Sequence, residues 1–148
     1  MRRGSFHYDI LARCRVEDAV ALMADVPRLT TRHPLAVRVT ELERAGDAIR
    51  SVAVTSRLRL GPFGYHITYR ADVVKLTPDE VVTVATQRPA TTLTNHARFH
   101  QEDGITHIGV DIGYESPAPL FSYGFEKAQF AHRELAKGIK EMLEAETG

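Results

Sequence analysis

The chain has 148 residues, 43% of them hydrophobic and 26% charged, and its 19 Lys and Arg residues balance its 19 Asp and Glu residues. This length suits one domain over residues 1–148, and the single cysteine, Cys14, excludes an intrachain disulfide and any multi-cysteine metal site. The zero net charge argues against a general nucleic-acid binder, and no apolar run is long enough to span a membrane. The first residues lack the apolar segment of a signal peptide, so we expect a cytoplasmic protein.

The first predicted element is a strand, because apolar and polar residues alternate over Phe6–Ile10. From residue 16 the period becomes helical, and two acidic residues fall in the first turn, where the helix dipole favours them. This helix runs over 16–25 and ends before Pro27. A second short helix is expected over 27–32, before Pro34.

The middle of the chain is a series of strands separated by turn-forming residues. Gly61–Gly64, Thr77–Glu80 and the dipeptide Asp103-Gly104 mark three of these turns. The alternation of apolar and polar residues predicts six strands, over 37–40, 49–60, 65–76, 81–88, 93–101 and 105–115.

The last element is one long helix over 120–146, which follows the two prolines of Ser116–Pro119. A curved sheet with one buried face needs a cover, and this helix is the largest candidate. We therefore predict an α+β fold, in which a curved seven-stranded antiparallel sheet wraps around the C-terminal helix. Two short helices follow the first strand.

This order of elements resembles the START/polyketide-cyclase-like superfamily, also called SRPBCC or helix-grip proteins, which includes the birch-pollen allergens. The resemblance spans nearly the whole chain. Besides the element order, it rests on the segments Phe6–Tyr8, Arg32–Pro34, Asp103–Thr106 and Tyr114–Pro117. None of these segments is a catalytic signature. The resemblance implies a hydrophobic cavity between sheet and helix that takes lipids, sterols, polyketides or similar molecules, with no cofactor.

The turns also predict how neighbouring strands pair, because the loop length sets the register. The expected partners are Leu60 with Tyr65, Ser56 with Tyr69, Leu76 with Val81, Val73 with Val84, Tyr69 with Arg88, Phe99 with Ile108, Asn95 with Ile112 and Leu93 with Tyr114.

These registers bring a few polar side chains together on the mainly apolar inner face, which is the usual form of a small-molecule site. Arg88 would pair with a ligand carboxylate or stabilise an enolate oxygen, and the tyrosines would hydrogen-bond a phenol or ketone. The candidate ligand-binding residues are Ser56, Tyr65, Tyr69, Arg88, Asn95, Tyr114 and His132.

Each candidate also has a structural interpretation. Arg88 could bend into solvent at a strand end, and Tyr69 could be a core aromatic whose hydroxyl bonds to Ser56. Tyr65 could gate the entrance or simply pack at the rim. His132 lies near the inward stripe of the long helix, where it could serve in acid–base chemistry or lie at the helix boundary.

The outer face offers candidate metal ligands, because the hairpin register puts His100 opposite His107 and His96 opposite Asp111. Arg98 lies between the two pairs and would repel a divalent ion. We therefore expect no metal site, and we expect this face to be solvated or to contact another subunit.

Three functions remain open on the sequence. The first is binding or transport of a small hydrophobic molecule, which leads because no acid–base pair is visible. The second is a cofactor-independent polyketide aromatase or cyclase activity, and the third is a protein-interaction module. The lone Cys14 is expected to be structural.

Overall fold

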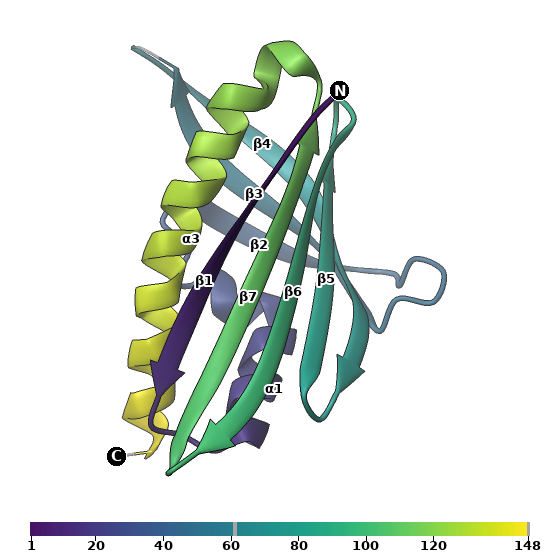
Figure 1. The fold of residues 1–148 in the computed structure, drawn as a ribbon. Helices are drawn as coiled ribbons and strands as arrows, with labels where there is room; N and C mark the ends of the chain where they lie inside the picture. Colours follow the sequence, from purple (N-terminus) through teal and green to yellow (C-terminus); the bar gives the residue numbers. More distant parts are fainter. Residues whose placement is uncertain (61, 148) are drawn as a thin grey trace.

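The computed structural model describes residues 1–60 and 62–147, and Figure 1 shows a curved sheet with a long helix along one side. The elements in chain order are β1 (Arg2–Ala12), α1 (Val16–Ala24), α2 (Val26–Thr30), β2 (Ala36–Leu42), β3 (Arg50–Leu60), β4 (Phe63–Thr77), β5 (Glu80–Gln87), β6 (Thr91–Glu102), β7 (Ile105–Ser116) and α3 (Ala118–Thr147).

The strands form one seven-stranded antiparallel sheet in the order β1-β7-β6-β5-β4-β3-β2. The predicted fold class is thus confirmed, with both short helices between β1 and β2. β1 is longer than predicted because it pairs with β7 along its whole length, from Arg2 to Ala12. Pro27 lies in the first turn of α2, and the Asp25 carboxylate caps that helix by accepting the Arg28 N–H at 3.3 Å.

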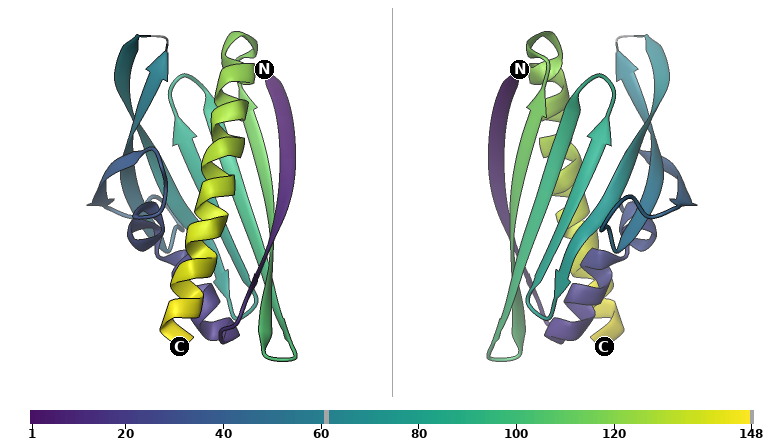
Figure 2. Two further views of the ribbon diagram at one scale, coloured as in Figure 1. Left: turned by 90° about the vertical axis from the view of Figure 1, so that its left-hand side faces the viewer. Right: turned by 90° about the vertical axis from the view of Figure 1, so that its right-hand side faces the viewer.

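The helices cover the inner face of the sheet unevenly. α3 packs against β1 and β7, and α1 packs against β5, β6 and β7 at the end where α3 finishes (Figure 2). Between them lies a core whose fully buried members come mainly from β3, β7 and α3: Val52, Val54, Ile108, Val110, Ile112, Ile139 and Leu143. Among the described residues, no helix is both long and apolar enough to cross a membrane.

The β6–β7 register is confirmed in full. Asp103 and Gly104 form the two-residue turn with φ of 54° and 78°, the left-handed conformation that such a hairpin requires. The predicted pairs of Phe99 with Ile108 and Leu93 with Tyr114 follow from this turn.

The predicted β3–β4 register is wrong by two residues. Leu60 pairs with Phe63 and not with Tyr65, so Ser56 lies opposite Ile67 and not opposite Tyr69. The strands continue further toward the turn than the four-residue loop allowed, although Gly61 of that loop lies outside the described residues. A shift of two preserves the side of the sheet to which each side chain points.

The predicted β4–β5 register is wrong by one residue beyond its turn. Leu76 does pair with Val81, but an irregularity between Val73 and Lys75 brings Val73 opposite Thr83 instead of Val84. A shift of one exchanges the two faces of the sheet. As a result Tyr69 and Arg88 are not cross-strand partners, and Arg88 follows the end of β5.

Charged side chains cross the outer face from strand to strand. His7 bonds to Asp9 at 3.0 Å and to Asp111 at 2.7 Å, and Asp111 in turn accepts from Arg98 at 2.9 Å. Further along, His96 lies 2.5 Å from Glu80, which also pairs with Lys75. We call this row of groups the outer-face charge chain: Asp9, His7, Asp111, Arg98, His96, Glu80 and Lys75.

Candidate ligand-binding cavity

A cavity of about 450 Å³ lies between the sheet and α3. Because α3 rests on β1 and β7, the inner faces of β3, β4 and β5 stand away from the helix and leave this space between them. Residues of α1, α2 and the segment after α2 close one side. All seven sequence-predicted candidates line the cavity, namely Ser56, Tyr65, Tyr69, Arg88, Asn95, Tyr114 and His132.

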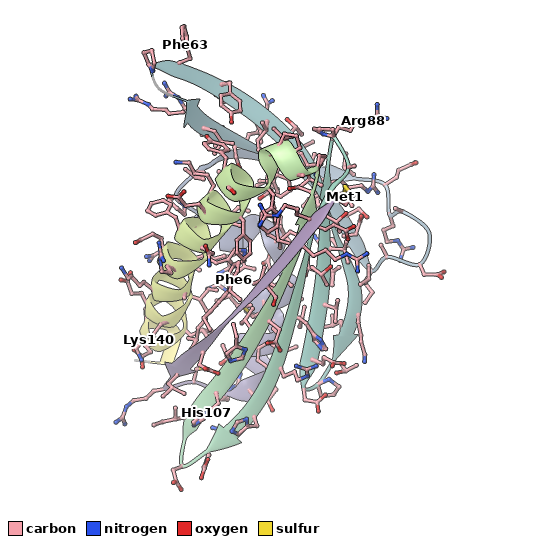
Figure 3. The ribbon with its side chains drawn as sticks, turned by 45° about the horizontal axis from the view of Figure 1, so that its top comes forward. Met1, Phe6, Phe63, Arg88, His107 and Lys140 are labelled. Atoms are coloured by element: carbon pink, nitrogen blue, oxygen red, sulfur yellow. The ribbon has the colours of Figure 1, made fainter. Side chains whose placement is uncertain are left out.

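Arg88 lies at the rim and not beside Tyr69, its expected cross-strand partner. It is exposed and sits at the end of the sheet far from His107 (Figure 3). Lys75, which regular alternation with Val73 along the strand would put on the inner face, is also exposed, and it pairs with Glu80 on the outer face. The irregularity in β4 explains both differences, since it exchanges the faces that the predicted register assigned.

The wall of the cavity carries polar groups that the protein leaves unpaired. Ser56 Oγ is fully buried and has no hydrogen-bond partner among the described residues. Burial raises the pKa of Tyr69 to about 12, so its hydroxyl stays protonated as a neutral donor and acceptor. Ser56 lies near enough to lower the Tyr69 pKa against the larger effect of burial, but its Oγ has no hydrogen-bond partner, so the hydrogen bond expected between the two hydroxyls is not formed.

His132 is the most enclosed titratable group of the lining, with 8% of its surface exposed. Its Nδ1 lies 2.9 Å from the Tyr8 hydroxyl, and the Phe6 ring packs edge-on against it at 5.8 Å. Burial, followed by the neighbouring His33, lowers the pKa of His132 to about 4. The imidazole is therefore neutral at pH 7.

The sequence reasoning missed His33 and Tyr8. His33 lines the cavity from the segment after α2, its Nδ1 accepts the Leu35 N–H at 3.2 Å, and burial lowers its pKa to about 4. For Tyr8 a signal was available, because the alternation in β1 puts it on the same face as Phe6 and Ile10. For His33 the signal was its place in Arg32–Pro34, one of the segments behind the family resemblance, but no periodic pattern leads into that loop to show which way the side chain points.

Two tyrosines connect the rim to α3. Tyr123 donates its hydroxyl to the Arg59 carbonyl at 2.8 Å, and Tyr65 donates to the Tyr123 hydroxyl at 3.3 Å. Tyr114 lies against Gly124, where an added Cβ would be 1.9 Å from the tyrosine hydroxyl. The two tyrosine hydrogen bonds tie the β3–β4 hairpin to α3 at Arg59 and Tyr65, whereas the exposed Phe63 at the end of the hairpin projects away from the helix (Figure 3).

The charge of the lining is low. Among the described lining residues the only lysine or arginine side chains are Arg88 at the rim and Lys127 on α3, and no aspartate or glutamate is present. The remaining polar groups are hydroxyls, amides and neutral imidazoles. Such a lining suits an uncharged ligand with a few hydrogen-bonding oxygens.

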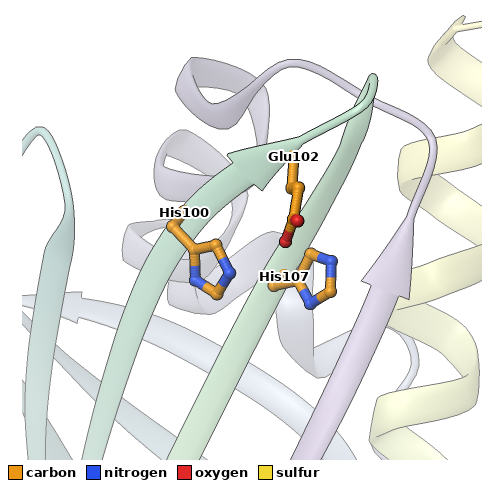
Figure 4. A group of neighbouring side chains, drawn as sticks. All are labelled: His100, Glu102 and His107. Atoms are coloured by element: carbon orange, nitrogen blue, oxygen red, sulfur yellow. The ribbon is translucent and has the colours of Figure 1, made fainter.

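A second group of chemically interesting side chains lies outside the cavity, at the β6–β7 hairpin. Figure 4 shows His100, Glu102 and His107, whose ligand atoms all lie within 4.8 Å of one another. The two imidazoles are stacked, with centroids 4.6 Å apart. Two imidazoles and a carboxylate could hold a transition-metal ion. Arg98, which argued against this in the sequence, is bonded to Asp111.

The sheet, the covering helix and the cavity between them define a helix-grip fold, as the resemblance implied. Solved structures with the same fold include a START superfamily protein from Mycobacterium smegmatis, with a TM-score of 0.72 over 95% of this chain and 97% of that chain at 14% identity. The Zhui aromatase/cyclase from Streptomyces sp. R1128 matches with a TM-score of 0.63 over 98% and 93% of the two chains at 11% identity.

The di-domain ARO/CYC StfQ from the steffimycin biosynthetic pathway matches with a TM-score of 0.77 at 17% identity. The match covers 99% of this chain and 52% of StfQ, so the chain spans about half the length of that protein. No family model and no curated protein matches the sequence. At these identities the comparisons establish the fold.

Proposed function

We propose that the protein binds a small, largely apolar and uncharged molecule in the cavity under α3. The observation that carries the proposal is the cavity itself, about 450 Å³ in volume and lined by apolar side chains with a few neutral polar groups. Ser56 supports it, because a buried hydroxyl without a partner costs about 1–3 kcal/mol unless something else bonds to it.

The fold neighbours support the same class of ligand. A START superfamily protein and aromatase/cyclases share this architecture. The absence of acidic side chains from the described lining speaks against a cationic ligand, because nothing there would neutralise a buried positive charge.

Native mass spectrometry of freshly purified protein tests the proposal directly. We expect a non-covalently bound hydrophobic molecule that is released on denaturation. The variant Ala85→Phe puts a ring into the cavity and should lose this molecule. The neighbouring Thr86→Phe carries the same ring on the exposed side of β5 and should keep it. Equal occupancy in both variants would contradict binding in this cavity.

A cyclase activity on a polyketide is the second candidate, favoured by the buried imidazole of His132 in the cavity wall and by the StfQ and Zhui folds. Such an enzyme releases a ring-closed product, whereas a carrier releases its ligand unchanged. Incubation with a synthetic poly-β-ketone and analysis of the released molecule by mass spectrometry separates the two functions. Loss of one water per ring closed would establish the enzyme.

A further inference from the structure

The contact between Tyr8 and His132 fixes which imidazole nitrogen carries the proton. A neutral imidazole has one donor and one acceptor nitrogen, and a tyrosine hydroxyl must donate to an acceptor when buried. Tyr8 does not line the cavity, and its described bonding partner is His132 Nδ1 at 2.9 Å. If Nδ1 were the donor, the Tyr8 proton would have no described acceptor. The hydroxyl therefore donates, and His132 carries its proton on Nε2.

His33 reaches the same state by a different route. Its Nδ1 accepts the backbone N–H of Leu35, and a backbone N–H can only donate. The proton of neutral His33 is therefore on Nε2 as well. Since both residues are neutral at pH 7, each presents one N–H group and no positive charge.

Both Nε2 atoms remain available to a ligand. His33 and His132 line the cavity, and neither Nε2 has a described partner. Among the described residues, Ser56 Oγ is the one fully buried side-chain nitrogen or oxygen without a partner. The two unpartnered Nε2 atoms are therefore not fully buried, and they keep some surface that a ligand can reach. The two N–H groups come from different elements, α3 and the segment after α2.

We propose that the Nε2–H groups of His132 and His33 are fixed donors that select ligands carrying a carbonyl-type acceptor oxygen. This inference rests on the proposed function and names the class of ligand, a neutral ketone, quinone or β-dicarbonyl compound. Tyr8 is a positioning residue, because it acts only by holding the proton of His132 on Nε2. An alcohol or hydrocarbon of the same shape would leave the two donors unpaired and bind more weakly.

The test uses two probes of nearly equal shape, 9-fluorenone and fluorene, which differ by one carbonyl oxygen. We expect the wild-type protein to bind fluorenone about tenfold more tightly than fluorene, as two hydrogen bonds would provide. Infrared spectra should show the carbonyl stretch of bound fluorenone at lower frequency than in an apolar solvent.

Variants separate this role from a structural one. His132→Phe should lower the preference for fluorenone by about threefold without weakening fluorene binding, and His33→Leu should do the same. His132→Gln keeps an N–H near the position of Nε2 and should retain the preference. Tyr8→Phe leaves both histidines in place but frees the proton of His132, so it should reduce the preference and move the carbonyl stretch back.

The outcomes distinguish the two proposals. Equal binding of both probes, or a carbonyl stretch unchanged by Tyr8→Phe and His33→Leu, would overturn the donor pair while leaving ligand binding in place. Binding of neither probe to the wild-type protein would contradict the proposed function, and the donor pair with it. If His132→Phe does not fold, Tyr8→Phe and His33→Leu carry the test.

Discussion

Burial of an imidazole without a charged partner makes the folding of this protein depend on pH. The unfolded chain takes up a proton on histidine near pH 6.5, whereas burial keeps the pKa of folded His132 at about 4. Between these values the unfolded state binds more protons, so the free energy of unfolding falls as the pH falls. Well above pH 6.5 the histidine is unprotonated in both states, and this effect disappears.

The first prediction follows from this difference. Between pH 7 and pH 5, His132 should remove about 2 kcal/mol from the free energy of unfolding. Urea denaturation at both pH values should show that His132→Gln loses about 2 kcal/mol less of its free energy of unfolding over this range than the wild-type protein does. His7 works in the opposite direction, because Asp111 and Asp9 raise its pKa, but it is common to both proteins and cancels. Identical pH dependence in the two proteins would argue against a buried neutral His132.

The second prediction concerns Gly124. Gly124→Ala forces the Tyr114 hydroxyl away from the helix, so it should destabilise the protein by about 1–3 kcal/mol and weaken ligand binding. In a Tyr114→Ala background the three atoms nearest to the added Cβ are absent, and alanine in a helix is then about 0.5–1 kcal/mol better than glycine. Denaturation of the wild-type protein, the two single variants and the double variant measures both effects. Gly124→Ala should lower the free energy of unfolding of the wild-type protein and raise that of Tyr114→Ala. Equal effects in both backgrounds would show that the two residues do not contact each other.

At the level of elements, the sequence predicts the register of two strands where the turn between them allows one loop length only. Asp103-Gly104 adopts the left-handed conformation that its residue types favour, and the β6–β7 register follows without error. Gly61–Gly64 contains enough turn-forming residues for loops of several lengths, so the β3–β4 register could not be chosen. Nothing in Val73–Lys75 distinguishes an irregular strand from a regular one, and that segment decides the side on which Arg88 emerges.

The third prediction concerns the connection between α3 and the β3–β4 hairpin. Tyr123→Phe removes the bond to the Arg59 carbonyl and the acceptor of the Tyr65 hydroxyl while keeping the ring. Amide hydrogen exchange over residues 55–68 should become about fivefold faster, as expected for the loss of one hydrogen bond. Ligand dissociation should become faster as well. Glu126→Gln, exposed on the same helix, is the control and should change neither rate. Unchanged exchange in Tyr123→Phe would mean that the hairpin is held by packing alone.

For the molecule as a whole, the residues that line the sheet side of the cavity could be predicted from the sequence, but the contributions of Tyr8 and His33 could not. The alternation of side chains assigned Ser56, Tyr69, Asn95 and Tyr114 to one face, and an error of two residues in one register did not change that assignment. The contributions of Tyr8 and His33 depend on where a helix and a loop rest on the sheet. That placement is set by packing between distant segments, which no local pattern encodes.

The fourth prediction is a change in global stability with ligand. A ligand that binds only the folded protein, present at 100 times its Kd, should raise the free energy of unfolding by about 2.7 kcal/mol. For a chain of this length the melting temperature should rise by about 5–10 °C. Differential scanning fluorimetry with 9-fluorenone measures the shift. Ala85→Phe should abolish it and Thr86→Phe should preserve it. A shift of equal size in both variants would place binding elsewhere on the protein.

The outer-face charge chain crosses five neighbouring strands, from Asp9 on β1 to Lys75 on β4, roughly at right angles to them. It lies toward the end of the sheet where Glu80 begins β5, whereas Arg88 lies at the other end of that strand, at the rim of the cavity. The chain therefore ties five strands together from outside, on the side of the sheet away from Arg88 and the rim of the cavity. Thermal motion of the sheet should be largest near the rim, where a ligand passes. The protein can then admit a ligand while its core keeps a constant shape.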